Sequence, residues 1–451
     1  MSYLFLSCTE FILIKNKQLE IEEMTQLKWG IGGVLTLAVV AVGGNLYADK
    51  SLKAYYQHST KQSNDLNLQY QQFQMGALNG SANWTAELVL DPCKPKEVIQ
   101  LKGQDHIQRS WNGYAIRSDI NITQAPGALQ SLLKEPLKVQ SKVNWLGTLN
   151  STLTTPVITR NEAQLQSRLD PMTLKFRAKP IEQQLKILDL QLEIPNLTVT
   201  DPNIHLQMVG LKLESNQGLN GEYLEAGETK IQMDLLKMSD RDINKPTNAE
   251  LKNFSIETQS ELTDRVVNTE MLLRLDEMKM PSAPAVQNVQ FNFNVLDVNR
   301  QKLQTLFDIL AKSENSCLAK EAMEKDMEPA LLAVINEGFR FESKENQFAI
   351  GEGVAQANVT GRIMPSHQST LMSMVKMMPS LMEYRADIQF DKNMISRIMN
   401  NYLQKGGISM SDQEIESMLS TMQSSGQVKR EGNVMKMSVD YKYGQTNFLT
   451  E

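Results

Sequence analysis

Methionine is the residue type whose number and position point most clearly to a chemical role. The chain has 25 Met, many of them in the last quarter. An unbranched, polarizable thioether side chain can repack around apolar ligands of different shapes. We therefore expect these residues to form a surface that holds a lipid or another apolar ligand. The candidates for this ligand groove are Met372, Met374, Met377, Met378, Met382, Met394, Met399, Met418 and Met422.

Two other interpretations of the methionines stay open. The first is an ordinary helical core in which Met takes the place of Leu. The second is a Cu(I) site, since thioethers suit this ion and His367 lies one or two helical turns before Met374 and Met377. Without paired His or Cys ligands, we predict no metal site.

The other reactive side chains are few and far apart. The chain has 4 His and 3 Cys, and it contains no C-x-x-C, no H-E-x-x-H, no G-x-S-x-G and no Walker loop. A nucleophile, a base and an orienting group cannot be assembled from such a set. We therefore expect a protein that is not an enzyme and that binds no cofactor.

Cys93 and Cys317 are the cysteines that lie beyond the N-terminal part of the chain. In an oxidising compartment an even pair can close a disulfide. The alternative is two unpaired thiols, because the sequence carries no geometry. Both possibilities stay open.

Composition and charge restrict the class of protein. The chain has 451 residues, and a hydrophobic fraction of 41% is ordinary for a folded protein. The net charge is -6, from 46 Lys+Arg against 52 Asp+Glu. Because this balance leaves no excess of cations to replace the counterions of a phosphate backbone, we expect no nucleic-acid partner.

An uncharged apolar stretch over residues 29–48 predicts a transmembrane anchor. About twenty residues at 1.5 Å each cross a hydrocarbon core of about 30 Å. Trp29 and Tyr47 stand at its ends, where aromatic rings favour the headgroup level. A cleaved signal peptide and a buried core helix are the competing interpretations. Lys28 favours a cytoplasmic N-terminus, so we expect the bulk of the chain in the periplasm.

The residues around this stretch divide into short segments. Residues 1–28 precede it, and a hypothesis is that translation starts at Met24, so that 1–23 would be a wrongly assigned start. After the anchor, residues 49–64 are polar and predict a stalk that separates the rest of the chain from the bilayer.

Strand patterns dominate residues 65–298, which we expect to form a β-rich periplasmic region. The clearest pattern alternates Val289, Phe291 and Phe293 with Gln290 and Asn292, which places one face on a core and the other in water. This alternation favours antiparallel pairing. The predicted strands cover 66–70, 84–90, 114–122, 139–149, 185–199, 204–213, 230–236, 254–262, 266–275 and 289–295.

Residues 299–451 predict an α+β, Met-rich periplasmic region. The helices expected there cover 301–313, 327–337, 366–382, 392–404 and 411–422. Ser411 and Glu414 have the spacing of a capping box at the start of the last helix. Strands are expected over 339–363, and a terminal hairpin over 435–443 is entered through Gly432.

Several local patterns resemble the YdgA-like proteins, bacterial inner-membrane proteins assigned to domain of unknown function 945. They include Tyr70-x-x-Phe73-x-x-Gly76, the strand ending in Leu90-Asp91-Pro92, and the closing Tyr441-x-Tyr443-Gly444-Gln445. The resemblance extends over nearly the whole chain from Met24. Many members have a His-Gly-Pro segment where this chain has 105–109, Asp-His-Ile-Gln-Arg. The resemblance implies an inner-membrane protein with a large periplasmic part, and it implies no activity.

Together these observations predict a single-pass inner-membrane protein with an α+β periplasmic part. Its fold is expected to consist of curved, mainly antiparallel β-sheets with helices from the C-terminal third, plus the one N-terminal transmembrane helix. The expected role is a non-enzymatic envelope protein that touches the lipid bilayer and shelters a lipid. The alternative role is a scaffold for envelope proteins, as a homodimer or with another protein and without a ligand.

Overall fold

The computed structural model describes most of the chain after residue 65. The described residues are 66–89, 98–125, 135–144, 146–162, 165–181, 184–216, 226–240, 247–281, 283–316, 320–397 and 411–449. The expected anchor and stalk, the two cysteines Cys93 and Cys317, and Met399 lie outside them. In the described part of the chain, every helix is too short or too polar to cross a membrane.

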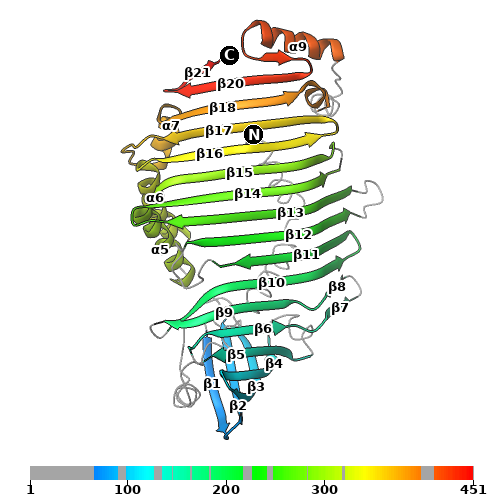
Figure 1. The fold of residues 1–451 in the computed structure, drawn as a ribbon, viewed down its shortest axis with the longest axis vertical. Coiled ribbons are helices and arrows are strands. Elements are labelled where there is room, and N and C mark those ends of the chain that lie inside the picture. The colour runs from blue at the N-terminus through cyan, green and yellow to red at the C-terminus, as the bar shows by residue number, and fades with distance from the viewer. Residues whose placement is uncertain are drawn as a thin grey trace. The chain divides into compact units, whose positions relative to one another are not determined.

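The chain divides into two compact units, Met1–Thr154 and Thr155–Glu451. In the first unit each strand pairs antiparallel with the next one along the chain (Figure 1). The strands are β1 (Leu66–Met75), β2 (Asn79–Val89), β3 (Val98–Ser110), β4 (Gly113–Gln124), β5 (Leu137–Asn144) and β6 (Leu149–Thr154).

The first unit buries one face of its sheet along β2 to β6. Along β3 and β5, alternate residues are fully buried and the residues between them are exposed. Trp84 is 1% exposed, and its indole Nε1 donates a hydrogen bond of 2.9 Å to Oδ1 of the equally buried Asp105. Gly103 makes room for this ring, because a Cβ there would lie 2.0 Å from Cε2 of Trp84.

The second unit is built on one long antiparallel sheet. From β10 to β18 each strand pairs with its neighbour in sequence, and β20 follows β18. Near the start of the unit, β8 and β9 pair with β10. The strands are β7 (Ile158–Glu162), β8 (Leu165–Leu169), β9 (Thr173–Ile181), β10 (Gln184–Thr200), β11 (Ile204–Ser215), β12 (Gly227–Asp240), β13 (Thr247–Leu262), β14 (Val266–Lys279), β15 (Val286–Asn299), β16 (Phe339–Ile350), β17 (Gly353–Ile363), β18 (Met382–Asp391), β19 (Lys429–Glu431), β20 (Val434–Lys442) and β21 (Gln445–Phe448).

A line of irregular residues crosses the strands from β10 to β15. We name it the break line, and it consists of Pro195, Gly210, Asp234, Asn253, Asp276 and Asn288. Regular pairing is interrupted at each of these positions and resumes on the other side. Gly210, Asn253 and Asn288 have φ values of 68°, 50° and 52°. Glycine and asparagine are the residues that adopt this left-handed conformation most readily.

The break line keeps apolar residues on one face of the sheet. Residues three apart in a regular strand point to opposite faces. Ile194 and Leu197 flank Pro195, yet they are only 2% and 6% exposed, whereas Pro195 itself is exposed. The equivalent pairs on the other strands are Met208 and Leu211, Met233 and Leu236, Leu251 and Phe254, Leu275 and Met278, and Val286 and Val289.

Helices cover the second unit at the two ends of the strands. They are α5 (Arg300–Ser316), α6 (Lys320–Asn336), α7 (Leu371–Leu381) and α9 (Asp412–Ser424), with a further helical segment over 392–397. Figure 1 shows α5, α6 and α7 at one end of the strands and α9 near the other. Two of the helices begin at capping boxes, formed by Thr370 with Ser373 and by Ser411 with Glu414.

The structure confirms the prediction of a mainly antiparallel β-rich fold. It also confirms the capping box at Ser411 and the terminal hairpin, which is β20 with β21. The strand expected over 139–149 is confirmed for 139–144, which lie in β5, but it does not continue to 149, because Gly147 has a φ of 81° in a turn between β5 and β6. No compact boundary falls at 298/299, since β15 pairs with β16 across it.

Candidate apolar binding face

The second unit carries an apolar surface that runs across its central strands. Cross-strand partners share a face of a sheet, and the rows Leu213, Ile231, Ile256, Leu273 and Met208, Leu236, Leu251, Met278 run from β11 to β14 in register. We name this surface the apolar face. Its members on β11 to β15 are Leu206, Met208, Leu211, Leu213, Ile231, Met233, Leu236, Met238, Leu251, Phe254, Ile256, Met271, Leu273, Leu275, Met278, Val286, Val289, Phe291 and Phe293.

The apolar face is only half-buried. Of its residues, Leu275 is 7% exposed, whereas nearly all the others keep an intermediate exposure and Met238 reaches 37%. Among the described elements, β11 and β12 make extensive contacts only with their neighbours in the sheet. On β11 and β12 the apolar face is therefore a contiguous surface that no described element covers, and such a surface is typical of a binding site.

The opposite face of the same strands, the outer face, is mainly polar and charged. Lys230 and Glu257 form an ion pair of 2.8 Å there, and Lys252 reaches Glu250 at 2.9 Å and Glu277 at 2.7 Å. Hydrogen bonds from Lys252 first, and then from Lys279 and Gln287, lower the pKa of Glu277 to about 2. This face is therefore the one that suits contact with water.

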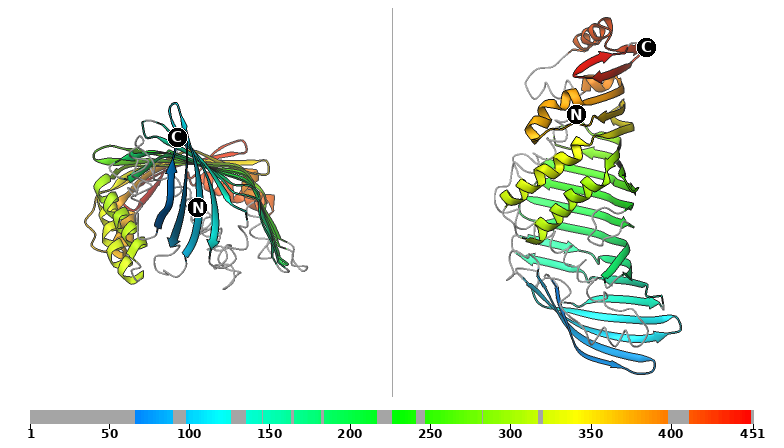
Figure 2. Two further views of the ribbon diagram at one scale, coloured as in Figure 1. Left: turned by 90° about the horizontal axis from the view of Figure 1, so that it is seen from below. Right: turned by 90° about the vertical axis from the view of Figure 1, so that its left-hand side faces the viewer.

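The apolar face lies on the inner side of a bend. Figure 2 (left) shows the strands of the second unit bending, with α5 and α6 on the inside of the bend. Leu303, Leu306 and Phe307 of α5 and Val334 of α6 pack in one cluster with Val267 of β14, which lies opposite Leu262 on the apolar face. The helices thus cover one end of the apolar face and leave its middle open.

The C-terminal end of the apolar face is closed by α9. Ile415 and Leu419 are 0% exposed and pack against Met435 of β20. The 392–397 segment adds Met394, which is 7% exposed and packs with Ile350. In this region the helices give the sheet a second layer.

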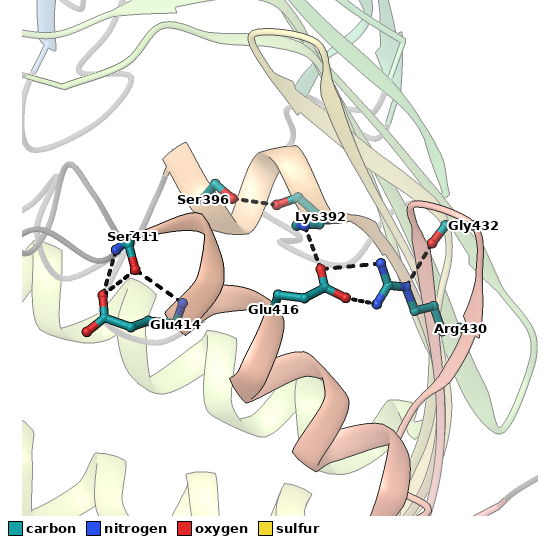
Figure 3. Close-up of polar contacts among 7 residues, drawn as sticks. All are labelled: Lys392, Ser396, Ser411, Glu414, Glu416, Arg430 and Gly432. Carbon is teal, nitrogen blue, oxygen red and sulfur yellow. Dashed lines mark hydrogen bonds and ion pairs between the residues drawn. The ribbon is translucent and has the colours of Figure 1, made fainter.

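An ion-paired cluster fixes α9 at this place. Glu416 of α9 accepts hydrogen bonds from Lys392 at 2.5 Å and from Arg430 of β19 (Figure 3). The Arg430 guanidinium first, and then the Lys392 ammonium, lower the pKa of Glu416 to about 2. The carboxylate therefore stays charged down to acidic pH and connects three separate segments.

The comparison with known families gives one match. The profile of a bacterial protein family of unknown function (DUF945) matches residues 27–448. The chain belongs to the DUF945 family. This confirms the resemblance to domain of unknown function 945 that the strand and turn patterns indicate. Neither the curated proteins nor the solved structures contain a match.

In this DUF945 protein the methionines predicted to line one groove lie in separate places. Met374 of α7 and Met394 are buried, whereas Met372 and Met377 are 66% and 42% exposed on α7. Met418 and Met422 pack with the α9 cluster, and Met378 and Met382 are half-buried. Figure 1 places α7 and α9 at opposite ends of the strands. The described candidates therefore fall into two groups at opposite ends of the strands, one at α7 and one around α9 that brings Met394, Met418 and Met422 together.

The residues of the apolar face were not recognised as a site from the sequence. Each strand from β10 to β15 contains two apolar residues separated by two others, with Gly, Asn, Asp or Pro between them. This repeated interval is the signal that could have identified a strand with one apolar face and a break.

A shallow depression of about 410 Å³ lies among the polar side chains of β16, β17, β18 and β20. Arg362 and Glu383 line it and form a two-point ion pair with distances of 2.9 and 2.8 Å. Among the residues that the structure describes, His, Cys, Asp and Glu form no group suited to a metal ion. The apolar face is thus the stronger candidate.

Proposed function

We propose that this DUF945 protein is a non-enzymatic envelope protein that binds a lipid on the apolar face of its second unit. The observation that carries the proposal is the half-buried state of apolar side chains on consecutive strands, from Leu206 on β11 to Phe293 on β15. Residues 29–48 anchor the protein in the bacterial inner membrane, and the two units lie in the periplasm. The membrane supplies the lipid.

The dimensions of the apolar face suit an acyl chain. Adjacent strands are about 4.8 Å apart, so the distance across β11 to β15 is about 19 Å. One leaflet of a hydrocarbon core of about 30 Å is about 15 Å thick, which is the depth that a lipid chain spans. Each CH₂ group that leaves water on such a surface contributes about 0.8 kcal/mol.

Two leucines next to each other on β12 allow a matched test of lipid binding. Leu236 pairs with Met208 and Leu251 on the apolar face, whereas Leu235 pairs with Val209 and Lys252 on the outer face. We expect Leu236→Glu to lower the amount of lipid that co-purifies with the full-length protein about tenfold or more, because the carboxylate would have to lose its water.

The control Leu235→Glu should leave the co-purified lipid unchanged. Lipid extraction and mass spectrometry of the purified full-length proteins measure both. Equal amounts of lipid in the two variants and the unaltered protein would contradict binding on the apolar face.

The membrane topology has its own test. A reporter enzyme that is active only outside the cytoplasm, fused after Glu451, should be active in cells. Deletion of residues 29–48 should abolish this activity and release the protein from the membrane fraction. A fusion that is active only in the cytoplasm would contradict the proposed orientation.

A further inference from the structure

A group of hydroxyl side chains borders the apolar face at the end of the strands nearest α5. We name it the hydroxyl patch, and it consists of Ser215, Thr229, Thr258, Ser260 and Thr269. These residues share the apolar face, because Thr258 lies two positions from Ile256 and pairs with both Thr229 and Met271. All five are half-buried.

The hydroxyls bond to one another but keep hydrogen-bonding capacity. Oγ of Ser215 lies 2.9 Å from Oγ1 of Thr229, and Oγ of Ser260 lies 3.3 Å from Oγ1 of Thr269. Each hydroxyl has one proton and two lone pairs. One proton serves each of these two bonds, so each pair retains a second proton as well as free lone pairs for a polar ligand. The Thr258 hydroxyl donates to the Thr229 carbonyl oxygen at 3.4 Å and keeps lone pairs that can accept.

The charged side chains near the patch point to the other face. Lys230 precedes Ile231 of the apolar face and pairs with Glu257 on the outer face, at 2.8 Å. On β11 to β14, no Lys or Arg shares the apolar face with the hydroxyl patch in the described residues. A carboxylate or phosphate would find no opposite charge there, and charged groups are costly to bury without one.

The opposite end of the same strands has a different border. Leu206, Met238 and Ala249 form a row there, and Met238 is 37% exposed. The row beyond it, at the end of the paired strands, is Ile204, Asp240 and Thr247. The apolar face thus ends at a row with one carboxylate at this end of the strands, whereas the other end carries five hydroxyls. An amphiphile with one chain and one polar end matches this asymmetry.

We propose that the hydroxyl patch binds the uncharged, hydroxyl- or ester-bearing end of the lipid whose chain lies on the apolar face. This inference rests on the proposed function and adds a class of ligand to it. The ligand is a neutral amphiphile with one acyl chain of the monoacylglycerol type, and its headgroup accepts a hydrogen bond from Thr229 and donates one to Thr258.

Three pure compounds with one chain of equal carbon number test the proposal: 1-monoolein, oleate and 1-octadecene. The full-length protein, held in an amphipathic polymer, is titrated with each. We expect 1-monoolein to bind about tenfold more tightly than 1-octadecene, because two hydrogen bonds of ordinary strength account for such a factor. Oleate should bind more weakly than 1-monoolein.

The variant Thr229→Val/Thr258→Val should bind 1-monoolein about tenfold more weakly and 1-octadecene unchanged, since Val keeps the shape of Thr without the hydroxyl. Thr198→Val, on the outer face of β10, is the control and should change neither affinity.

The outcomes separate the inference from the proposed function. An unaltered protein that prefers oleate or 1-octadecene overturns the inference and leaves chain binding intact. Unchanged 1-monoolein binding by the double variant also overturns it. If the unaltered protein binds none of the three compounds, the proposed function fails as well. The ranking by the unaltered protein decides the inference even if the variant does not fold.

Discussion

The two units use the same antiparallel order of strands and differ in what happens to their apolar faces. In the first unit, β3 and β4 pair without interruption from Leu101 to Ser110, and alternate residues are fully buried. In the second unit, pairing is interrupted at the break line, and the apolar side chains from β11 to β15 stay half-buried.

This difference distinguishes a folding core from a surface that can bind a ligand. A fully buried face contributes its hydrophobic free energy to folding, whereas a half-buried face keeps part of this free energy for a ligand. The first unit has Trp84 and Asp105 buried at 1% exposure each, which indicates a core. In the middle of the second unit, no described apolar side chain on β11 to β13 is fully buried.

The largest difference between the two units is expected when an aromatic side chain of each is truncated. Trp84→Ala removes a fully buried ring and leaves Asp105 without its indole donor, and such truncations cost about 3–5 kcal/mol. Phe291→Ala, on the half-buried apolar face, should cost about 1 kcal/mol.

Urea unfolding of the full-length protein, followed by hydrogen exchange in peptides from each unit, measures both costs. A Phe291→Ala cost equal to that of Trp84→Ala would show that the apolar face is a folding core, and the contrast between the units would fail.

A smaller effect is expected at the break line, which the first unit lacks. Gly210→Ala places a Cβ 2.1 Å from Oδ2 of Asp234 at a φ of 68°. The left-handed conformation costs a non-glycine residue about 1–2 kcal/mol, and the contact with Asp234 adds to it.

Gly432→Ala is the matched control, since Gly432 has a φ of 65° and nothing within 4 Å of the added Cβ. The difference between the two variants in the free energy of unfolding isolates the contact at the break line. Equal costs would mean that Asp234 moves away freely and that close packing does not fix the break line.

The smallest effect concerns α9, which covers part of the second unit. The pKa of Glu416 is about 2 in the folded protein, below the usual value of about 4.3 in unfolded chains. Its contribution to stability is therefore present above about pH 4.3 and is lost as the pH falls towards 2.

Hydrogen exchange of the α9 amides, corrected for intrinsic rates, should show less protection for Glu416→Gln than for the unaltered protein at pH 6. The two proteins should become equal near pH 2. Glu431→Gln is the control, because Glu431 pairs with Lys436 within one hairpin and not with α9. A difference between Glu416→Gln and the unaltered protein that persists unchanged at pH 2 would contradict the role of the ionised carboxylate.

Much of the fold could be predicted from local patterns. The alternation of Val289, Phe291 and Phe293 gives β15, and the spacing of Leu303, Leu306 and Phe307 gives α5. Ser411 and Glu414 mark the start of α9 because a capping box is a local hydrogen-bond pattern. The β3 strand was not predicted, since Gly103 and the buried Asp105 interrupt its apolar alternation.

The candidate site could not be predicted in the same way. Leu273 of the second unit and Ile120 of the first occupy the same kind of alternating pattern, yet Ile120 is 0% exposed and Leu273 is half-buried. Whether an apolar face is covered depends on which elements pack across it. A local strand pattern does not contain this tertiary packing. The methionines stood out by composition, but Met374 and Met418 were placed by packing on different helices.

Photo-crosslinking at two neighbouring leucines of β14 tests the account most directly. Leu273 pairs with Ile256 and Phe291 on the apolar face, and Leu272 pairs with Glu257 and Asn292 on the outer face. A photoreactive amino acid is placed at either position of the full-length protein in living cells, and adducts are identified by mass spectrometry. The account predicts a lipid adduct at Leu273 and none at Leu272. No lipid adduct at Leu273, or equal adducts at both positions, would contradict it.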